Sequence, residues 1–399
     1  MVPRADVYAA LEKPCDKDRV LNRRNRGVLT VAGEGDRDVL LAEALESERN
    51  SFNLVRLGAA AAVVVSHSFA VLIGEGEGEP LSGATPYTLG QHAVNVFFVL
   101  SGVMLSRSWS LNPNLWRFAI ARLLRIYPAL AACGLVVALL LAPLGTHDAL
   151  GTYFVDRDTL LYPVRVLFAF NRAGLDEVFT SGTLKPGSIN GPLWTIKYEI
   201  ATYALFVVAA AVRVVRRPTF AVAFLLGATL VVIGMDLWGV AQRAPTLLPP
   251  GRFLMSFALG IAAYAFRAHI PLGVHCLAAF LALAVAAHGG IFEKPAYIVL
   301  TGYGALYFGS FVVPRASAWA GRTDLSYGVY LYAWPVQQLL LFRWPEIGLT
   351  VHIVASLAGA TALAALSWRY VERPALALKN GFGSRMAARN LSLDPLAGR

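Results

Sequence analysis

From residue 50 onward, long apolar stretches alternate with short polar connections. A helix of about 20 apolar residues crosses the hydrocarbon core of a bilayer, and backbone groups in lipid must be satisfied within the element. The pattern therefore predicts an all-α polytopic membrane protein with about ten transmembrane helices in one bundle. The predicted spans lie near residues 54–73, 88–108, 125–143, 192–212, 218–235, 251–267, 272–288, 295–313, 325–342 and 350–369.

Basic residues gather in every second connection between these spans, whereas residues 74–80 and 289–294 are poor in them. This is the positive-inside pattern, so we expect both termini in the cytoplasm and the protein in the inner (plasma) membrane as a multi-pass protein. The basic connections hold Arg107, Arg117, Arg122 and Arg125, then Arg213, Arg216 and Arg217, and then Arg315 and Arg322.

Composition agrees with this class, because the chain is 56% hydrophobic and only 15% charged. A net charge of +10 invites a nucleic-acid partner, but the cations lie at the ends of apolar spans, so we expect a lipid bilayer and no nucleic acid. The cysteines are far apart and no histidine has a metal-ligand spacing, so we expect neither a disulfide framework nor a metal site.

Three regions are expected along the chain. Residues 1–49 carry mixed charge and form a cytoplasmic N-terminal extension, residues 50–378 form the transmembrane domain, and residues 379–399 form a flexible cytoplasmic tail. The longest outer connection, about 144–191, holds five acidic residues and several aromatic side chains. A connection of this length usually has a function, such as a lid or a binding surface.

The first span places two ionisable groups on one helix face. Eleven positions separate Arg56 from His67, which returns both side chains to nearly the same face, about 16 Å apart along the axis. Glu199 in the fourth span is predicted at a depth similar to that of His67, where a carboxylate would orient the imidazole as a base. A buried His–Glu bridge that only joins two helices explains the same residues equally well.

Arg122 and Arg125 share a face at the predicted inner mouth of the third span, near Arg56. Three guanidinium groups at one level could hold phosphates, although a topology anchor is the simpler interpretation of such a cluster.

Polar and aromatic side chains in other spans are candidates for contact with a substrate. Asn95 lies toward the outer end of the second span, and Tyr330, Trp334 and Gln337 lie in the ninth. Aromatic stripes more often serve packing or an interfacial belt. Small residues such as Gly102 favour close helix packing. No base lies next to Ser101 in the sequence, so we do not assign Ser101 as a nucleophile.

Taken together, the motifs resemble the integral-membrane acyltransferase-3 family, and in particular its exopolysaccharide and lipopolysaccharide O-acetyltransferase branch. The resemblance covers about residues 50–378 and departs from many relatives at Ala333, where they have a histidine. Its carriers are Arg56 with His67, FFVLSG at 97–102, Arg122 with Arg125, PLWTIKYE at 192–199, GRFLMSFALG at 251–260, LSYGVYLYAWP at 325–335 and YVERP at 370–374.

The resemblance implies transfer of an acyl group, most often acetyl, from cytoplasmic acyl-CoA to a hydroxyl of a surface glycan or related carbohydrate. The hypothesis makes His67 the general base or a transient acyl carrier and Glu199 its orienter. Arg56, Arg122 and Arg125 would bind acetyl-CoA phosphates, and the acceptor would contact Asn95, Trp194, Tyr330, Trp334 and Gln337. The alternatives are a proton-coupled transporter or flippase of a polysaccharide precursor, and a catalytically silent scaffold.

Overall fold

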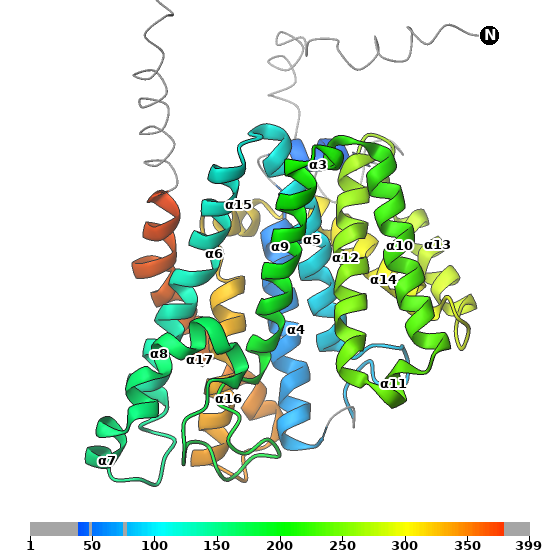
Figure 1. Cartoon of the computed structure of the whole chain (residues 1–399). Coiled ribbons are helices and arrows are strands. Elements are labelled where there is room, and N and C mark those ends of the chain that lie inside the picture. Colours follow the sequence, from blue (N-terminus) through cyan, green and yellow to red (C-terminus); the bar gives the residue numbers. More distant parts are fainter. Residues whose placement is uncertain (1–38, 48–49, 75–77, 379–399) are drawn as a thin grey trace, which may run out of the picture. The chain divides into compact units, whose positions relative to one another are not determined.

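The structure is a computed structural model that describes residues 39–47, 50–74 and 78–378. Within these ranges it is built from helices (Figure 1). Its strands are the two-residue β1 (Val39–Leu40) and β2 (Pro271–Leu272), which pair antiparallel. The long helices are α4 (Phe52–Leu72), α5 (Leu89–Leu111), α6 (Leu115–Val136), α9 (Ile196–Ala211), α10 (Pro218–Leu237), α12 (Leu248–Ala265), α13 (Val274–Ala286), α14 (Glu293–Ser310), α16 (Ser326–Arg343) and α17 (Leu349–Ser367).

Each predicted span overlaps one of these helices. Among the described residues, seven helical segments are long and apolar enough to cross a membrane. An eighth is counted if α14 and α15 (Pro314–Arg322), which meet at a bend of 105°, form one broken span. The helices α13 and α16 are not in this count. The helix α13 is short, and α16 carries many polar and aromatic side chains. The multi-pass helical class is therefore confirmed, whereas the number ten and the sides of the termini stay predictions.

The third span differs from its prediction in a way that affects the site. The helix α6 begins at Leu115, ten residues before the predicted start, and the Asn114 side chain caps it by accepting from the Arg117 N–H at 2.9 Å. Arg122 and Arg125 consequently lie inside the helix and not at its mouth. The helix continues as a π-turn over Val137–Leu141.

Two glycines allow α5 and α12 to approach closely. A Cβ atom on Gly102 would lie 2.4 Å from the Phe257 carbonyl oxygen, and one on Gly260 would lie 2.1 Å from the Val99 carbonyl oxygen. The predicted packing role of Gly102 is therefore confirmed. The helix α4 packs on α5 and also on α16. It therefore stands between the α5–α12 pair and the α16–α17 pair (Figure 1).

The 144–191 connection is folded onto the bundle. It contains α7 (Leu150–Val155) and α8 (Arg157–Ala169), and α8 packs on α6. Its last part is held on α16, because the Trp334 indole donates to the Ser188 carbonyl oxygen at 2.9 Å and the Asn190 amide donates to the Leu331 carbonyl oxygen at 2.9 Å. The connection then enters α9 through a 3₁₀ turn at Gly191–Thr195.

The described end of the N-terminal extension packs on the helices. The helix α3 (Leu41–Glu46) buries Leu41 and Leu45 against α14, next to the β1–β2 pair. The rest of the predicted extension and the predicted tail, residues 379–399, lie outside the described residues. Following the predicted orientation, we call the end of the bundle that carries residues 112–114, 212–217 and 311–325 the inner end, and the opposite end the outer end.

Candidate active site

Two adjacent cavities lie in the interior of the bundle, and Val94, Thr195 and Tyr330 line both of them. The inner cavity is also lined by Arg56, Phe97, Phe98, Ser101, Glu199, Ser326 and Tyr327. The outer cavity is the larger of the two and is also lined by Val63, Ser66, His67, Ala70, Glu79, Thr88, Gly90, Gln91, Pro192, Trp194 and Arg252. The shared residues form a wall between the two cavities.

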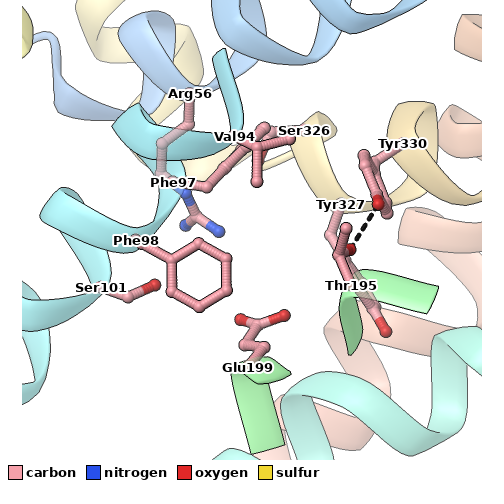
Figure 2. Close-up of a pocket in the computed structure, with 10 residues that line it drawn as sticks. All are labelled: Arg56, Val94, Phe97, Phe98, Ser101, Thr195, Glu199, Ser326, Tyr327 and Tyr330. Atoms are coloured by element: carbon pink, nitrogen blue, oxygen red, sulfur yellow. Dashed lines mark hydrogen bonds between the residues drawn. The ribbon is translucent and has the colours of Figure 1, made fainter. Parts of the chain in front are cut away.

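Opposite charges face each other across the inner cavity. Figure 2 shows the Arg56 guanidinium and the Glu199 carboxylate pointing into it from opposite sides. The Glu199 carboxylate also accepts a short hydrogen bond from the Tyr203 hydroxyl, one helical turn further along α9. The cavity therefore presents a cation, a carboxylate and the Ser101 hydroxyl within a largely aromatic lining.

Asp324, which the sequence analysis did not single out, pairs with two of the predicted phosphate-binding arginines. One carboxylate oxygen accepts from Arg56 Nη1 at 2.9 Å and from Arg125 Nη2 at 2.7 Å, and the other accepts from the Ser326 hydroxyl at 2.6 Å. Burial alone would raise the pKa of Asp324, but the two guanidinium groups outweigh burial and hold the pKa of this carboxyl well below its usual range.

Arg122 differs from its two neighbours. Its guanidinium lies 5.6 Å from the centre of the Phe118 ring and 6.0 Å from that of Tyr203, in cation–π contacts. In the described part of the chain it forms no ion pair, and its Nε has no hydrogen-bond partner. Of the three predicted phosphate-binding arginines, Arg122 alone is therefore without a carboxylate partner among these residues.

His67 lines the outer cavity, together with Trp194 and Tyr330 from the predicted acceptor set. Its ring meets the Trp334 indole edge-on, with 5.1 Å between centroids. Its Nδ1 has no hydrogen-bond partner among the residues that the structure describes. The Tyr330 hydroxyl donates to the Pro192 carbonyl oxygen at 2.6 Å, which fixes its ring in the shared wall.

The structure does not form the predicted contact between His67 and Glu199. The two side chains line different cavities, and the Thr195 and Tyr330 side chains stand between those cavities. The Glu199 carboxylate instead accepts from Tyr203. The prediction rested on a similar depth for the two side chains, and depth does not specify which cavity a side chain faces.

Two predicted acceptor-binding residues are fully buried and are absent from the linings of both cavities. The Gln337 amide donates at 2.8 Å both to the Val64 carbonyl oxygen and to the Ser68 hydroxyl, so it joins α16 to α4. The Asn95 side chain is also fully buried. Their positions favour helix packing over direct contact with a ligand in these cavities.

Arg252 of α12 was missed by the sequence analysis, although it lies in GRFLMSFALG. It lines the outer cavity with only 7% of its surface exposed. A single arginine within an apolar helix was the available signal, since such residues usually face an internal cavity. Within residues 39–47, 50–74 and 78–378, no group of three or more His, Cys, Asp or Glu side chains could hold a metal ion.

Comparison with known proteins gives one family and two relatives. The acyltransferase-3 family model, described as an acyltransferase domain, matches residues 49–369. An O-acetyl transferase of Shigella phage Sf6 is 30% identical over 331 residues, which cover 81% of this chain and 95% of that protein. Nodulation protein 10 of Rhizobium leguminosarum bv. viciae is 27% identical over 387 residues, covering 88% and 98% respectively. No solved structure matches the chain.

Proposed function

The chain belongs to the acyltransferase-3 family, and from this membership and the geometry of its cavities we propose that it transfers an acetyl group from acetyl-CoA to a carbohydrate hydroxyl. The donor enters at the inner end, and the acceptor, a surface glycan or related sugar, enters at the outer end. The relative named as an O-acetyl transferase supports acetyl as the transferred group and oxygen as its acceptor.

The single observation that carries this proposal is that two cavities adjoin each other and share three lining residues, Val94, Thr195 and Tyr330. A donor and an acceptor approaching from opposite sides of a membrane need two compartments that meet at one point. Arg56 and Glu199 belong to one compartment, and His67 belongs to the other. The transferred carbonyl would lie at the shared wall, within reach of both.

In the proposed reaction, His67 accepts the proton of the acceptor hydroxyl as that oxygen attacks the thioester carbonyl. The new C–O bond forms, the C–S bond breaks, and the protonated imidazole returns its proton to the departing CoA thiolate. Arg56 stabilises the negative charge that develops on the carbonyl oxygen. The Glu199 carboxylate accepts hydrogen bonds from amide groups of the pantetheine arm.

On the donor side, we assign phosphate binding first to Arg122. Arg56 and Arg125 already share Asp324 as a partner, so a phosphate would have to compete with that carboxylate. Arg122 has its charge available, and a guanidinium suits phosphate oxygens.

A transporter or flippase is the second candidate, because two adjoining cavities lined by ionisable side chains would also suit a permeation route. Family membership favours group transfer. The two functions differ in a measurable way, since only the transferase consumes the thioester of acetyl-CoA.

The first test is binding and turnover of acetyl-CoA by purified full-length protein. We expect His67→Ala to bind acetyl-CoA but to lose thioester turnover, because the base is gone and the donor cavity is intact. His269→Ala, which alters an exposed histidine, is the matched control and should behave as wild type. Substantial turnover by folded His67→Ala would refute the assignment of the base.

The same assay tests the donor site. We expect Arg122→Gln to weaken acetyl-CoA binding by on the order of tenfold, the value of one or two hydrogen bonds to a charged group. If no variant and no wild-type sample binds acetyl-CoA, the transporter becomes the better hypothesis.

A further inference from the structure

A buried cation without a carboxylate partner lies near the outer end of α12. The Arg252 guanidinium sits 5.3 Å from the centre of the Tyr87 ring and 4.9 Å from that of Phe253. Among the described residues it forms no ion pair, and its Nη1 is buried without a hydrogen-bond partner. Aromatic rings compensate only part of the cost of burying a charge, so a further anionic partner would stabilise this site.

Arg252 is placed where a ligand can reach it. It lines the outer cavity that holds His67, and it also lines a second space, the lateral cavity. Gln91 is likewise common to both, so these two side chains form the junction between them. The lateral cavity is lined by Pro86, Tyr87, Gln91, Val232, Met235, Leu248, Pro249, Arg252 and Lys294.

The other charges around this junction already have partners. The Glu79 carboxylate accepts from the backbone N–H groups of Leu81 at 3.1 Å and Leu89 at 2.5 Å, where it stabilises the start of α5. Lys294 forms a short ion pair with Asp236. Among the described residues, neither acidic side chain forms an ion pair with Arg252, so Arg252 keeps its charge and its Nη1 donor for a ligand.

We propose that Arg252 binds an anionic group of the carbohydrate acceptor, a carboxylate or a phosphate, while the reacting hydroxyl lies beside His67. This inference rests on the proposed acyl transfer and specifies its acceptor class. A planar guanidinium binds two oxygens of a carboxylate or phosphate at once. Gln91 adds an amide donor, because its carbonyl oxygen already accepts from the Thr88 N–H at 3.2 Å.

The test compares three sugars on full-length protein in nanodiscs of zwitterionic lipid, which supplies no competing net charge. Glucuronate offers a carboxylate, glucose 1-phosphate offers a phosphate, and glucose offers neither. Binding is measured by calorimetry for wild type, Arg252→Gln, Arg252→Lys and Arg243→Gln. Arg243 is an exposed arginine on the neighbouring α11 (Val240–Arg243) and serves as the matched control.

We expect wild type and Arg243→Gln to bind one of the anionic sugars about tenfold or more tightly than glucose, as hydrogen bonds to a charged group provide. Preference for glucuronate identifies an acidic sugar, and preference for glucose 1-phosphate identifies a phosphate. Arg252→Gln should lose the preference. Arg252→Lys should retain part of it, because the charge remains but the planar fork is lost.

Equal binding of all three sugars by wild type, no sugar binding by wild type, or an undiminished preference in Arg252→Gln would overturn the proposal. If Arg252→Gln does not fold, an undiminished preference in Arg252→Lys would overturn it. Acetyl-CoA turnover is measured on the same samples. If the protein prefers an anionic sugar but does not turn over acetyl-CoA, the proposed acyl transfer is refuted and the anion site at Arg252 stands. If it turns over acetyl-CoA without this preference, only the anion site is refuted.

Discussion

Asp324 balances the charge of two arginines, one of which, Arg56, lines the inner cavity. Its carboxylate holds Arg56 and Arg125 together, and those guanidinium groups come from α4 and α6. One carboxylate thus joins α4, α6 and the start of α16, near the point where the donor would enter in the proposed function. The same pairing keeps two cations from acting as open phosphate sites.

We expect Asp324→Asn to lower the free energy of unfolding by roughly 2–3 kcal/mol. Removing one partner of a buried ion pair costs roughly 3–5 kcal/mol, and these side chains retain 13–24% exposure, which reduces the loss. Unfolding in mixed micelles measures the difference. Asp158→Asn is the matched control, because its pair with Arg165 is 37–45% exposed and should contribute about 0.5 kcal/mol or less. Equal effects of the two variants would contradict the prediction.

The depressed pKa of Asp324 gives the same pair a pH dependence. An aspartate has a pKa of about 3.9 when unfolded, and the folded value is lower. The stabilisation is therefore complete above the unfolded pKa and is lost as pH falls below about 4 toward the folded value. Wild type should lose more stability than Asp324→Asn between about pH 5 and pH 3. Parallel curves for the two proteins would refute this contribution.

The sequence predicted single residues well where a helical period governs them. Arg56 and His67 both face the bundle interior, as eleven helical steps require. Partners that come from elsewhere in the chain were not predictable in the same way. Asp324 is 268 positions from Arg56 and belongs to a connection, where no period applies. The predicted His67–Glu199 contact is not formed for a related reason. A similar depth could be predicted from the sequence, but the position of Tyr330 between the two cavities could not.

At the scale of elements, the close contact of α5 and α12 holds the two cavities in place. Val94 and Arg252 line the outer cavity from these two helices, so its width depends on their separation. Without a hydrophobic driving force between helices in lipid, such contacts rely on small residues and close packing. The sequence identified Gly102 as a packing residue, but its partner Gly260 required the structure.

We expect Gly102→Ala to destabilise the protein by about 1–3 kcal/mol, because the added methyl group meets backbone atoms that cannot move aside. Gly58→Ala in α4 is the control, since a Cβ atom there has no neighbour within 4 Å. That change should be neutral or stabilising by about 0.4–1 kcal/mol. Thermal unfolding of both variants in one detergent measures the contrast, and a Gly102→Ala variant as stable as Gly58→Ala would contradict the close contact.

At the scale of the whole molecule, the bundle holds two cavities that share Val94, Thr195 and Tyr330, and the proposed function makes them a donor compartment and an acceptor compartment. Hydrophobic periodicity predicted the helices that surround these compartments. It could not predict the compartments themselves, because α6 begins ten residues early and the 144–191 connection folds against α16. Both features change which side chains reach the centre.

The wall makes a prediction about the two halves of the reaction. Val94 lines both cavities, so Val94→Phe should fill the junction while most of the donor site remains. We expect transfer to a sugar acceptor to fall by on the order of a hundredfold, since small displacements of reacting groups cost this much. Binding of acetyl-CoA should change far less.

Transfer is measured with labelled acetyl-CoA and an acceptor glycan, and donor binding is measured on the same samples. Val208→Phe adds the same ring at a position of α9 that is 60% exposed, and it should leave both quantities unchanged. A folded Val94→Phe variant with full transfer would mean that the acyl group does not pass between these cavities. Loss of donor binding equal to the loss of transfer would instead place the acetyl group of the bound donor inside the wall itself.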